Sequence, residues 1–341
     1  MERRVFIIAA VAGGIGLAEY AAINGWMNGM RRSTAPSVKD YEKYGERAAL
    51  LAITPNDEFY VTSKGLTPRI DASKWRLQLN GLVERPFSIT YADLLALPSF
   101  DRALTLECID NEIGGHIFGN ARWTGAALKP LIERAQPKPE ASYVAMWAAD
   151  GLSTGHPLDR VWREENFIAY RMNGADLPPQ HGYPARLFIP GKFGMKQPKW
   201  ITRLEFRRQP YTGYWEKSGW SDSCERWAHA RFSGLKNGMA FPAASGQSLE
   251  LRGYALGNLD GIRSIEISLD SGGSWQPAEI FSNPSPLVWA FWRYTWASPK
   301  PGTYFLRARA IDGQGRVEGY GPRDTFPDGA TGQQVLKVHI T

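Results

Sequence analysis

The last third of the chain is a series of short segments in which apolar residues recur at every second position. Such alternation places the apolar side chains on one face of a strand, so each segment predicts a half-buried β-strand. No helix-forming stretch interrupts the series after about residue 230, and Asp/Gly-rich turns separate its members. We therefore expect a separate immunoglobulin-like β-sandwich over 231–341. Its strands are expected at 249–251, 265–269, 291–296, 305–311 and 335–340.

The preceding region, 56–230, mixes strand-like and helix-like patterns. Thr90 and Asp93 fit the capping box of a short helix that ends at Pro98, and Thr124 is expected to cap a second helix through Ala135. Strands are expected at 59–61, 75–79, 83–89, 103–107, 143–148, 167–172 and 185–189. The predicted fold class is α+β, with a mixed α/β domain over 56–230 followed by the all-β sandwich.

Composition excludes several classes of protein. Hydrophobic residues at 43% and charged residues at 22% fit neither a disordered chain nor a polytopic membrane protein. Gly and Pro together number 58 of 341 residues (35 and 23), which favours turns and short strands over an all-α bundle. The net charge of +6 is scattered, so we expect no nucleic-acid partner, whereas an anionic ligand would suit the excess.

The N-terminus resembles an export signal. Arg3 and Arg4 precede an apolar, uncharged run over 5–18, which is shorter than the roughly 20 residues that span a bilayer. The arginine pair resembles the twin-arginine pattern. We expect residues 1–30 to be an export signal, or alternatively a retained membrane anchor, and residues 31–55 to be a linker. A periplasmic or exported location follows.

The chain contains two cysteines, Cys108 and Cys224. An exported protein can form a disulfide, but two cysteines 116 positions apart make neither a zinc site nor a c-type haem attachment motif. Cys108 stands between an expected strand and a glycine loop. Three interpretations remain open at this point: a ligand to a soft metal, a nucleophile with His116 or His156 as its base, and a buried core residue.

A second cluster combines glycines with cationic side chains. The run 181–186 contains His181 and Arg186, and the run 190–200 contains Lys192, Lys196 and Lys199. Strand ends with glycines and cations are suited to binding a phosphate, although a solvated basic loop is an equal alternative.

Taken together, these motifs resemble the sulfite oxidase family of mononuclear molybdenum enzymes, from about residue 56 to the C-terminus. The resemblance rests on the cysteine loop, Trp-Thr-Gly at 123–125, His-Gly-Tyr-Pro-x-Arg at 181–186 and Gly-x-x-Gly-Met-Lys-x-x-Lys-Trp at 191–200, while 265–275 is similar to the family's dimerisation sandwich. It implies a molybdenum–molybdopterin cofactor with Cys108 as the protein ligand to the metal. The residues that it implies for cofactor binding are Tyr60, Thr62, Ser63, Lys64, Cys108, Asp150, His181, Arg186, Lys196, Gln197 and Lys199.

The substrate half of the family pattern is altered. Thr62 and Ile113 stand where the resemblance leads us to expect pocket arginines, and Trp220 replaces the pocket tyrosine, so that Cys108 and Trp220 are the candidate catalytic residues. An oxyanion needs charge-assisted hydrogen bonds. Other basic residues are candidates to supply them, namely Lys64, Arg122 and Arg231.

The resemblance implies two-electron oxygen-atom transfer, with water as the oxygen source in the oxidising direction. Sulfite is the leading substrate hypothesis within a class of small anionic compounds and S- or N-oxides. The sequence contains no flavin, haem or iron–sulfur motif, so electrons are expected to pass to an external carrier, such as cytochrome c or a membrane redox subunit. The family also implies a homodimer. The alternatives are a reductase of sulfoxides or other small S- or N-oxides, and a metal-free binding protein on the same fold.

Overall fold

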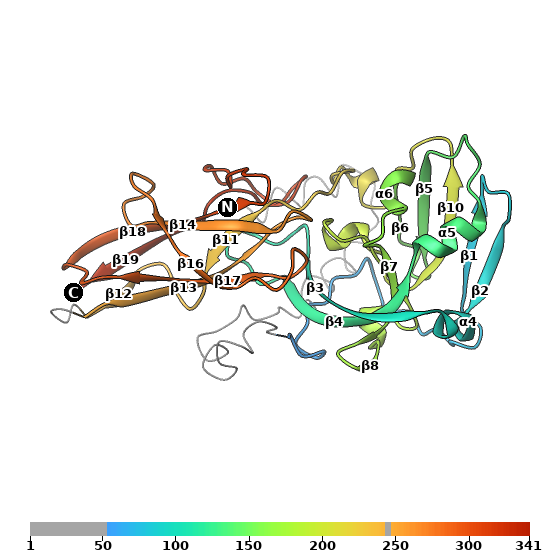
Figure 1. Cartoon of the computed structure of the whole chain (residues 1–341), viewed down its shortest axis with the longest axis horizontal. Coiled ribbons are helices and arrows are strands. Elements are labelled where there is room, and N and C mark those ends of the chain that lie inside the picture. Colours follow the sequence, from blue (N-terminus) through green and yellow to red (C-terminus); the bar gives the residue numbers. More distant parts are fainter. Residues whose placement is uncertain (1–52, 243–246) are drawn as a thin grey trace, which may run out of the picture.

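The computed structural model describes residues 53–242 and 247–341, in which strands dominate and helices are short. A mixed part lies at one end of the long axis and a two-sheet sandwich at the other (Figure 1). The expected export signal and nearly all of the expected linker lie outside the described residues. Within the described ranges, no helix is long and apolar enough to cross a membrane.

The first sheet of the mixed part has the strand order β2-β1-β10-β5-β6. Alternation along β1 buries Leu77 and Leu79 in the largest core cluster, and β1 pairs in antiparallel fashion with β2 and in parallel with β10. The strands expected at 75–79 and 83–89 therefore pair with each other, although the second begins only at Phe87. The strands of this sheet are β1 (Arg76–Gly81), β2 (Phe87–Thr90), β5 (Tyr143–Ala148), β6 (Ser153–Pro157) and β10 (Ile201–Arg207).

The second sheet has the order β3-β4-β7-β8, and β9 pairs with β7. Two of its strands lead into the candidate site, because β3 ends one residue before Cys108 and β9 begins at Arg186. The strands are β3 (Ser99–Glu107), β4 (Phe118–Ala127), β7 (Phe167–Met172), β8 (Ala175–Asp176) and β9 (Arg186–Phe188).

Short helices connect these strands. Thr90 caps the first, since its hydroxyl accepts from the Asp93 backbone N–H at 3.0 Å while the Asp93 carboxylate accepts from the Thr90 N–H at 2.8 Å. The expected capping box is thus confirmed. The α-helices are α4 (Tyr91–Ala96), α5 (Lys129–Ala135) and α6 (Leu158–Val161), and the 3₁₀ turns are η2 (Pro179–His181), η3 (Gly194–Lys196) and η4 (Glu216–Ser218).

Two local predictions are wrong. Thr124 does not cap a helix, because it lies within β4, which pairs with β3 on one side and β7 on the other. The small residues after Trp123 fit that close packing: a Cβ on Gly125 would lie 2.3 Å from the Ile168 carbonyl oxygen. The helix begins only at Lys129. The segment 59–61 is not a strand either, and runs as an irregular stretch past the candidate site.

The C-terminal part packs two sheets around one apolar core. One sheet has the order β11-β13-β17-β16 and the other β12-β19-β18-β14-β15. All five expected strands are present, and with the mixed part they confirm the α+β class. The division of the chain at residue 230 stays a prediction. The strands are β11 (His229–Phe232), β12 (Met239–Phe241), β13 (Leu249–Leu256), β14 (Ile262–Ser268), β15 (Gln276–Pro277), β16 (Glu279–Ser282), β17 (Ala290–Trp296), β18 (Gly302–Asp312) and β19 (Val335–Ile340).

The sandwich packs against the end of the sheet that carries the cysteine loop. The Phe118 ring of β4 lies tilted against Tyr254 at 4.9 Å and meets Trp289 edge-on at 5.5 Å between ring centroids. Arg226 is buried at this junction, where its guanidinium donates to the carbonyls of Thr105 and Gly257. Buried aromatic and charge-assisted contacts of this kind fix the sandwich relative to the strand that precedes Cys108.

Candidate active site

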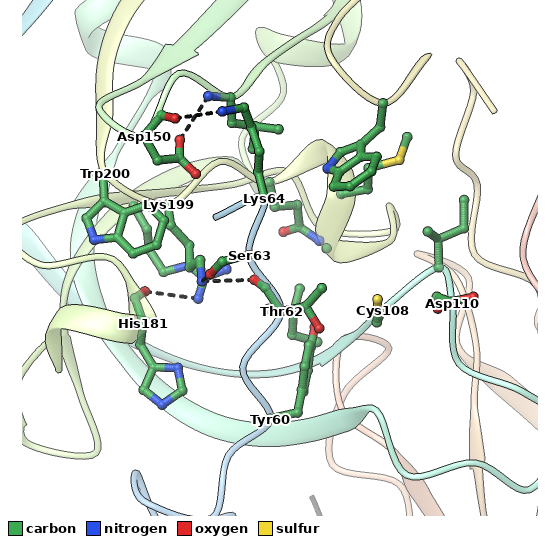
Figure 2. Close-up of a pocket in the computed structure, with 18 of the residues that line it drawn as sticks. Tyr60, Thr62, Ser63, Lys64, Cys108, Asp110, Asp150, His181, Lys199 and Trp200 are labelled. Carbon is green, nitrogen blue, oxygen red and sulfur yellow. Dashed lines mark hydrogen bonds between the residues drawn. The ribbon is translucent and has the colours of Figure 1, made fainter. Parts of the chain in front are cut away.

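A cavity of about 110 Å³ lies where the second sheet, the segment 59–64 and the loops after β5, β9 and β10 converge. It brings together eleven of the twelve residues that the sequence predicts for the site. They are Tyr60, Thr62, Ser63, Lys64, Cys108, Asp150, His181, Arg186, Gln197, Lys199 and Trp220. Side chains separated by more than 150 positions in the sequence therefore meet in one place (Figure 2).

Cys108 lies in the cavity wall and is 7% exposed. Burial raises the pKa of its thiol to about 12, although a hydrogen bond from the Asp110 backbone acts in the opposite direction. A thiol with this pKa carries its proton at neutral pH and is a poor free nucleophile. A bound metal would displace that proton, because thiols coordinate as thiolates.

The nucleophile interpretation also lacks a base. His116 is exposed, and neither it nor His156 lines the cavity. His156 is buried elsewhere, with Nε2 3.1 Å from the Lys196 carbonyl oxygen. Both cysteines are free, so the disulfide that an exported location permits is not formed.

Arg186 and His181 form one side of the cavity. The Arg186 guanidinium donates from Nη1 to the His181 carbonyl at 3.1 Å and lies over the Phe188 ring at 4.6 Å. Its Nε is buried and has no hydrogen-bond partner among the described residues. Burial lowers the pKa of His181 to about 4, so its ring is neutral at pH 7. Its Nε2 donates to the Asn56 carbonyl at 2.9 Å, which leaves Nδ1 as an acceptor.

Lys199 connects this side to the segment 59–64. Its ammonium donates to the Thr62 carbonyl at 2.9 Å, to Ser63 Oγ at 2.6 Å and to the Gln180 carbonyl at 2.9 Å. Burial and the nearby Arg186 lower the pKa of Lys199 to about 7. An incoming anion would favour the charged form of this side chain.

Lys64 and Asp150 face each other at the upper edge of the cavity in Figure 2. The Lys64 ammonium donates to the Asp150 backbone carbonyl at 3.0 Å and lies 4.8 Å from the centre of the Tyr214 ring. The Asp150 carboxylate accepts from the Leu152 N–H at 2.9 Å, so it is held by its own turn. We refer to Lys64, Arg186 and Lys199 as the cationic end of the cavity.

The opposite end has a different character. Ile109 belongs to an apolar cluster there against which Met195 and Trp220 pack, and Asp110 lies beside Cys108. Thr325, from the loop between β18 and β19, donates to Asp110 Oδ1 at 2.7 Å. Burial raises the pKa of Asp110, and the bond from Thr325 opposes that shift. We refer to Ile109, Asp110, Met195 and Trp220 as the cysteine end.

Lys196 is the one predicted cofactor-binding residue that does not line the cavity. Its side chain is fully buried on the other side of η3, where it pairs with Glu216 at 2.7 Å and Asp222 at 3.1 Å. Gln197 does line the cavity, but its amide holds a neighbouring loop, since it donates to the Lys192 carbonyl and accepts from the Ile189 N–H. Adjacent positions in a 3₁₀ turn point in different directions, which the motif alone does not reveal.

The structure adds residues that the sequence prediction missed. Asp110, Trp200 and Trp215 line the cavity, and Trp200 lies under the Lys199 ammonium, 4.4 Å from the ring centre. Asp110 carries a signal that could have been used, because it is a carboxylate two positions after the cysteine in the same loop. Two of the basic residues suggested for oxyanion binding, Arg122 and Arg231, do not line the cavity. Arg231 is buried in an ion pair with Glu318 at 2.7 Å.

Comparison with known proteins agrees with this arrangement. The family model described as "Oxidoreductase molybdopterin binding domain" matches residues 64–215. A *Bacillus subtilis* protein named "Uncharacterized oxidoreductase YuiH" is 32% identical over 163 residues, covering 48% of this chain and 80% of the relative. The sulfite oxidase of *Arabidopsis thaliana* is 26% identical over 338 residues, covering 80% of this chain and 84% of the relative. The chain belongs to the sulfite oxidase family of molybdopterin-dependent oxidoreductases.

The fold is shared with a solved structure. The solved structure of the sulfane dehydrogenase SoxCD from *Paracoccus pantotrophus* superposes with a TM-score of 0.73 at 22% identity, covering 84% of this chain and 80% of that one. The chain spans 32% of the fungal nitrate reductase and 49% of the human sulfite oxidase that it matches. As a member of the sulfite oxidase family, the protein is a molybdenum oxidoreductase with a molybdopterin cofactor.

The residues present fit this cofactor. A pterin phosphate is an anion, and the cationic end offers Lys64, Lys199 and the unpartnered Nε of the Arg186 guanidinium. Molybdenum binds sulfur ligands, including thiolates, and Cys108 lies in the same cavity. Among the described residues, no group of three or more His, Cys, Asp or Glu side chains could hold a metal ion.

Proposed function

We propose that this enzyme catalyses two-electron oxygen-atom transfer between water and a small sulfur or nitrogen compound. The observation that carries the proposal is the convergence of the Cys108 thiol with Arg186 and Lys199 in one cavity. Molybdenum held by molybdopterin supplies the redox chemistry when bound. In the oxidising direction, sulfite and water would give sulfate, two protons and two electrons. In the reducing direction, an S- or N-oxide, two protons and two electrons would give the reduced compound and water.

The protein residues would hold and orient the cofactor. Cys108 would be the thiolate ligand to molybdenum, and the cationic end would bind the anionic phosphate. Tyr60, Thr62 and Ser63 would line the bound pterin, with Asp150 fixing the turn beside it. Burial of the site supports this role, because charge-assisted hydrogen bonds are stronger where water is excluded.

Two classes of substrate remain, namely sulfite and uncharged S- or N-oxides, and the geometry favours the oxides. Sulfite is supported by the similarity to sulfite oxidases. However, the cations that line the cavity lie at the end proposed for the phosphate, and Thr62 and Ile113 offer no guanidinium for an oxyanion. The cysteine end instead combines a carboxylate, a thioether and an indole. That lining favours reduction of an uncharged S- or N-oxide.

The remaining assignments are part of the same proposal. Electrons would be exchanged with an external carrier, such as cytochrome c or a membrane redox subunit. The protein would form a homodimer through the sandwich. Its location would be exported or periplasmic, with a twin-arginine signal or an N-terminal anchor.

Turnover in both directions tests the proposal. The holoenzyme would be assayed with reduced dye plus dimethyl sulfoxide or trimethylamine N-oxide, and separately with ferricyanide plus sulfite. We expect dye oxidation with the uncharged oxides. Ferricyanide reduction with sulfite alone would favour the sulfite assignment, and no turnover in either assay by protein that contains molybdenum would contradict the proposed reaction.

A further inference from the structure

The two ends of the cavity differ in charge, and this difference bears on what can approach Cys108. Each lysine at the cationic end already donates to protein oxygens: Lys64 to the Asp150 carbonyl, and Lys199 to Thr62, Ser63 and Gln180. At the cysteine end, the charged side chain in the cavity lining is Asp110. Figure 2 shows Asp110 on the side of Cys108 that faces away from His181 and Lys199.

The Asp110 carboxylate is held in place from outside the cysteine loop. Thr325 donates to its Oδ1 at 2.7 Å from the loop that joins β18 to β19. The same loop presents Phe326, whose ring meets Trp220 edge-on at 5.1 Å between centroids. Two neighbouring residues of the sandwich thus contact the polar and the aromatic side chain of the cysteine end.

We propose that Asp110, positioned by Thr325, is the specificity-determining residue that excludes oxyanions from the cysteine end and admits uncharged S- or N-oxides. This inference rests on the proposed function and names its substrate class. A dianion such as sulfite would meet a carboxylate in a partly buried cavity, where like charges repel more strongly than in water. An uncharged oxide meets no such repulsion, and its alkyl groups can pack against Trp220 and Met195.

The chain offers a matched set of variants for the test. Asp110→Asn removes the charge while keeping the shape, and Asp110→Glu restores it. Glu112→Gln removes one carboxylate from the same loop at an exposed position outside the cavity lining, so it controls for net charge. Thr325→Val removes the hydroxyl that holds Asp110 but keeps the side-chain volume.

The measurement is the affinity of the holoenzyme for sulfate, an unreactive oxyanion, by competition against dimethyl sulfoxide turnover and by tryptophan fluorescence. We expect Asp110→Asn to bind sulfate about tenfold more tightly than the wild type, as removal of a like charge predicts. Thr325→Val should shift the affinity in the same direction by less. Asp110→Glu and Glu112→Gln should bind sulfate with the affinity of the wild type.

Equal sulfate affinity in the wild type, Asp110→Asn and Thr325→Val, with molybdenum bound and dimethyl sulfoxide reduced, would overturn this inference alone. An equal gain in Glu112→Gln would also overturn it, because net charge would then explain the effect. Wild-type protein that turns over sulfite but no uncharged oxide would contradict the substrate class. Protein without molybdenum would contradict the proposed function itself, so the two failures are distinguishable.

Discussion

Lys196 Nζ lies 2.7 Å from Glu216 Oε1, and the two side chains are 0% and 3% exposed. Asp222 Oδ1 accepts a second bond from the same ammonium at 3.1 Å, and Thr154 donates to Glu216. The loop that carries Glu216 also carries Trp215 and Trp220, which line the cavity. This buried ion pair therefore holds the loop that forms part of the cavity wall. Lys196 thus supports the shape of the site and is not part of the cavity lining.

Removing Lys196 should destabilise the protein. Lys196→Met leaves Glu216 buried without its cation, and loss of one partner from a buried pair costs about 3 to 5 kcal/mol. We expect the free energy of unfolding to fall by that amount in denaturant titrations. Lys217→Met, at an exposed position of the same loop, is the control. A decrease of less than about 0.5 kcal/mol, the range of ordinary surface substitutions, would contradict the structural role.

Removing Lys199 should weaken cofactor retention. A hydrogen bond to a charged group contributes about 1.5 to 3 kcal/mol, which corresponds to a roughly ten- to hundredfold change in affinity. Lys199→Met should therefore contain less pterin per chain, measured as the fluorescent oxidised pterin released on denaturation. The control is Lys74→Met, whose side chain is 85% exposed. Equal pterin content in both variants would show that Lys199 does not bind the cofactor.

Acidification should destabilise the protein through its buried histidines. Burial lowers the pKa of His229 to about 4, whereas an unfolded histidine titrates near about 6.5. Between these values the unfolded chain binds more protons, so the free energy of unfolding falls as the pH falls through this window. His229→Gln should reduce the loss of stability between pH 7 and pH 4.5, measured by denaturant midpoints. His116→Gln, at an exposed position, is the control and should lose as much stability as the wild type. If His229→Gln also lost as much, buried His229 would not be a cause of the acid destabilisation.

The sequence predicts much of this fold because many elements are locally consistent. The spans Tyr143–Ala148, Phe167–Met172 and Val335–Ile340 match their expected ranges, since the apolar pattern and the flanking turns agree. The failure at Thr124 has a tertiary cause. Its neighbours Gly125 and Ala126 are small enough for a helix start, but pairing with β3 and β7 decides the conformation.

The candidate site was predictable where the motif residues point inward and not where they point away. Cys108, His181, Arg186 and Lys199 line the cavity as expected. Lys196 does not, because the direction of a side chain in η3 depends on the turn that forms. The contact of Thr325 with Asp110 joins residues 215 positions apart and depends on how the sandwich docks, which no local pattern encodes.

We propose that Cys108 holds molybdenum in this cavity, and the metal content of the protein is the decisive test. The chain supplies its own control, since Cys224 is also buried and free but lies outside the cavity lining. We would measure molybdenum by elemental mass spectrometry in protein from a host that makes molybdopterin. We predict about one molybdenum per chain in the wild type and in Cys224→Ala, and loss of the metal in Cys108→Ala, because the Cys108 thiolate would be the protein's ligand to it. Wild-type protein without molybdenum, or Cys108→Ala protein that retains it as fully as Cys224→Ala, would contradict the account.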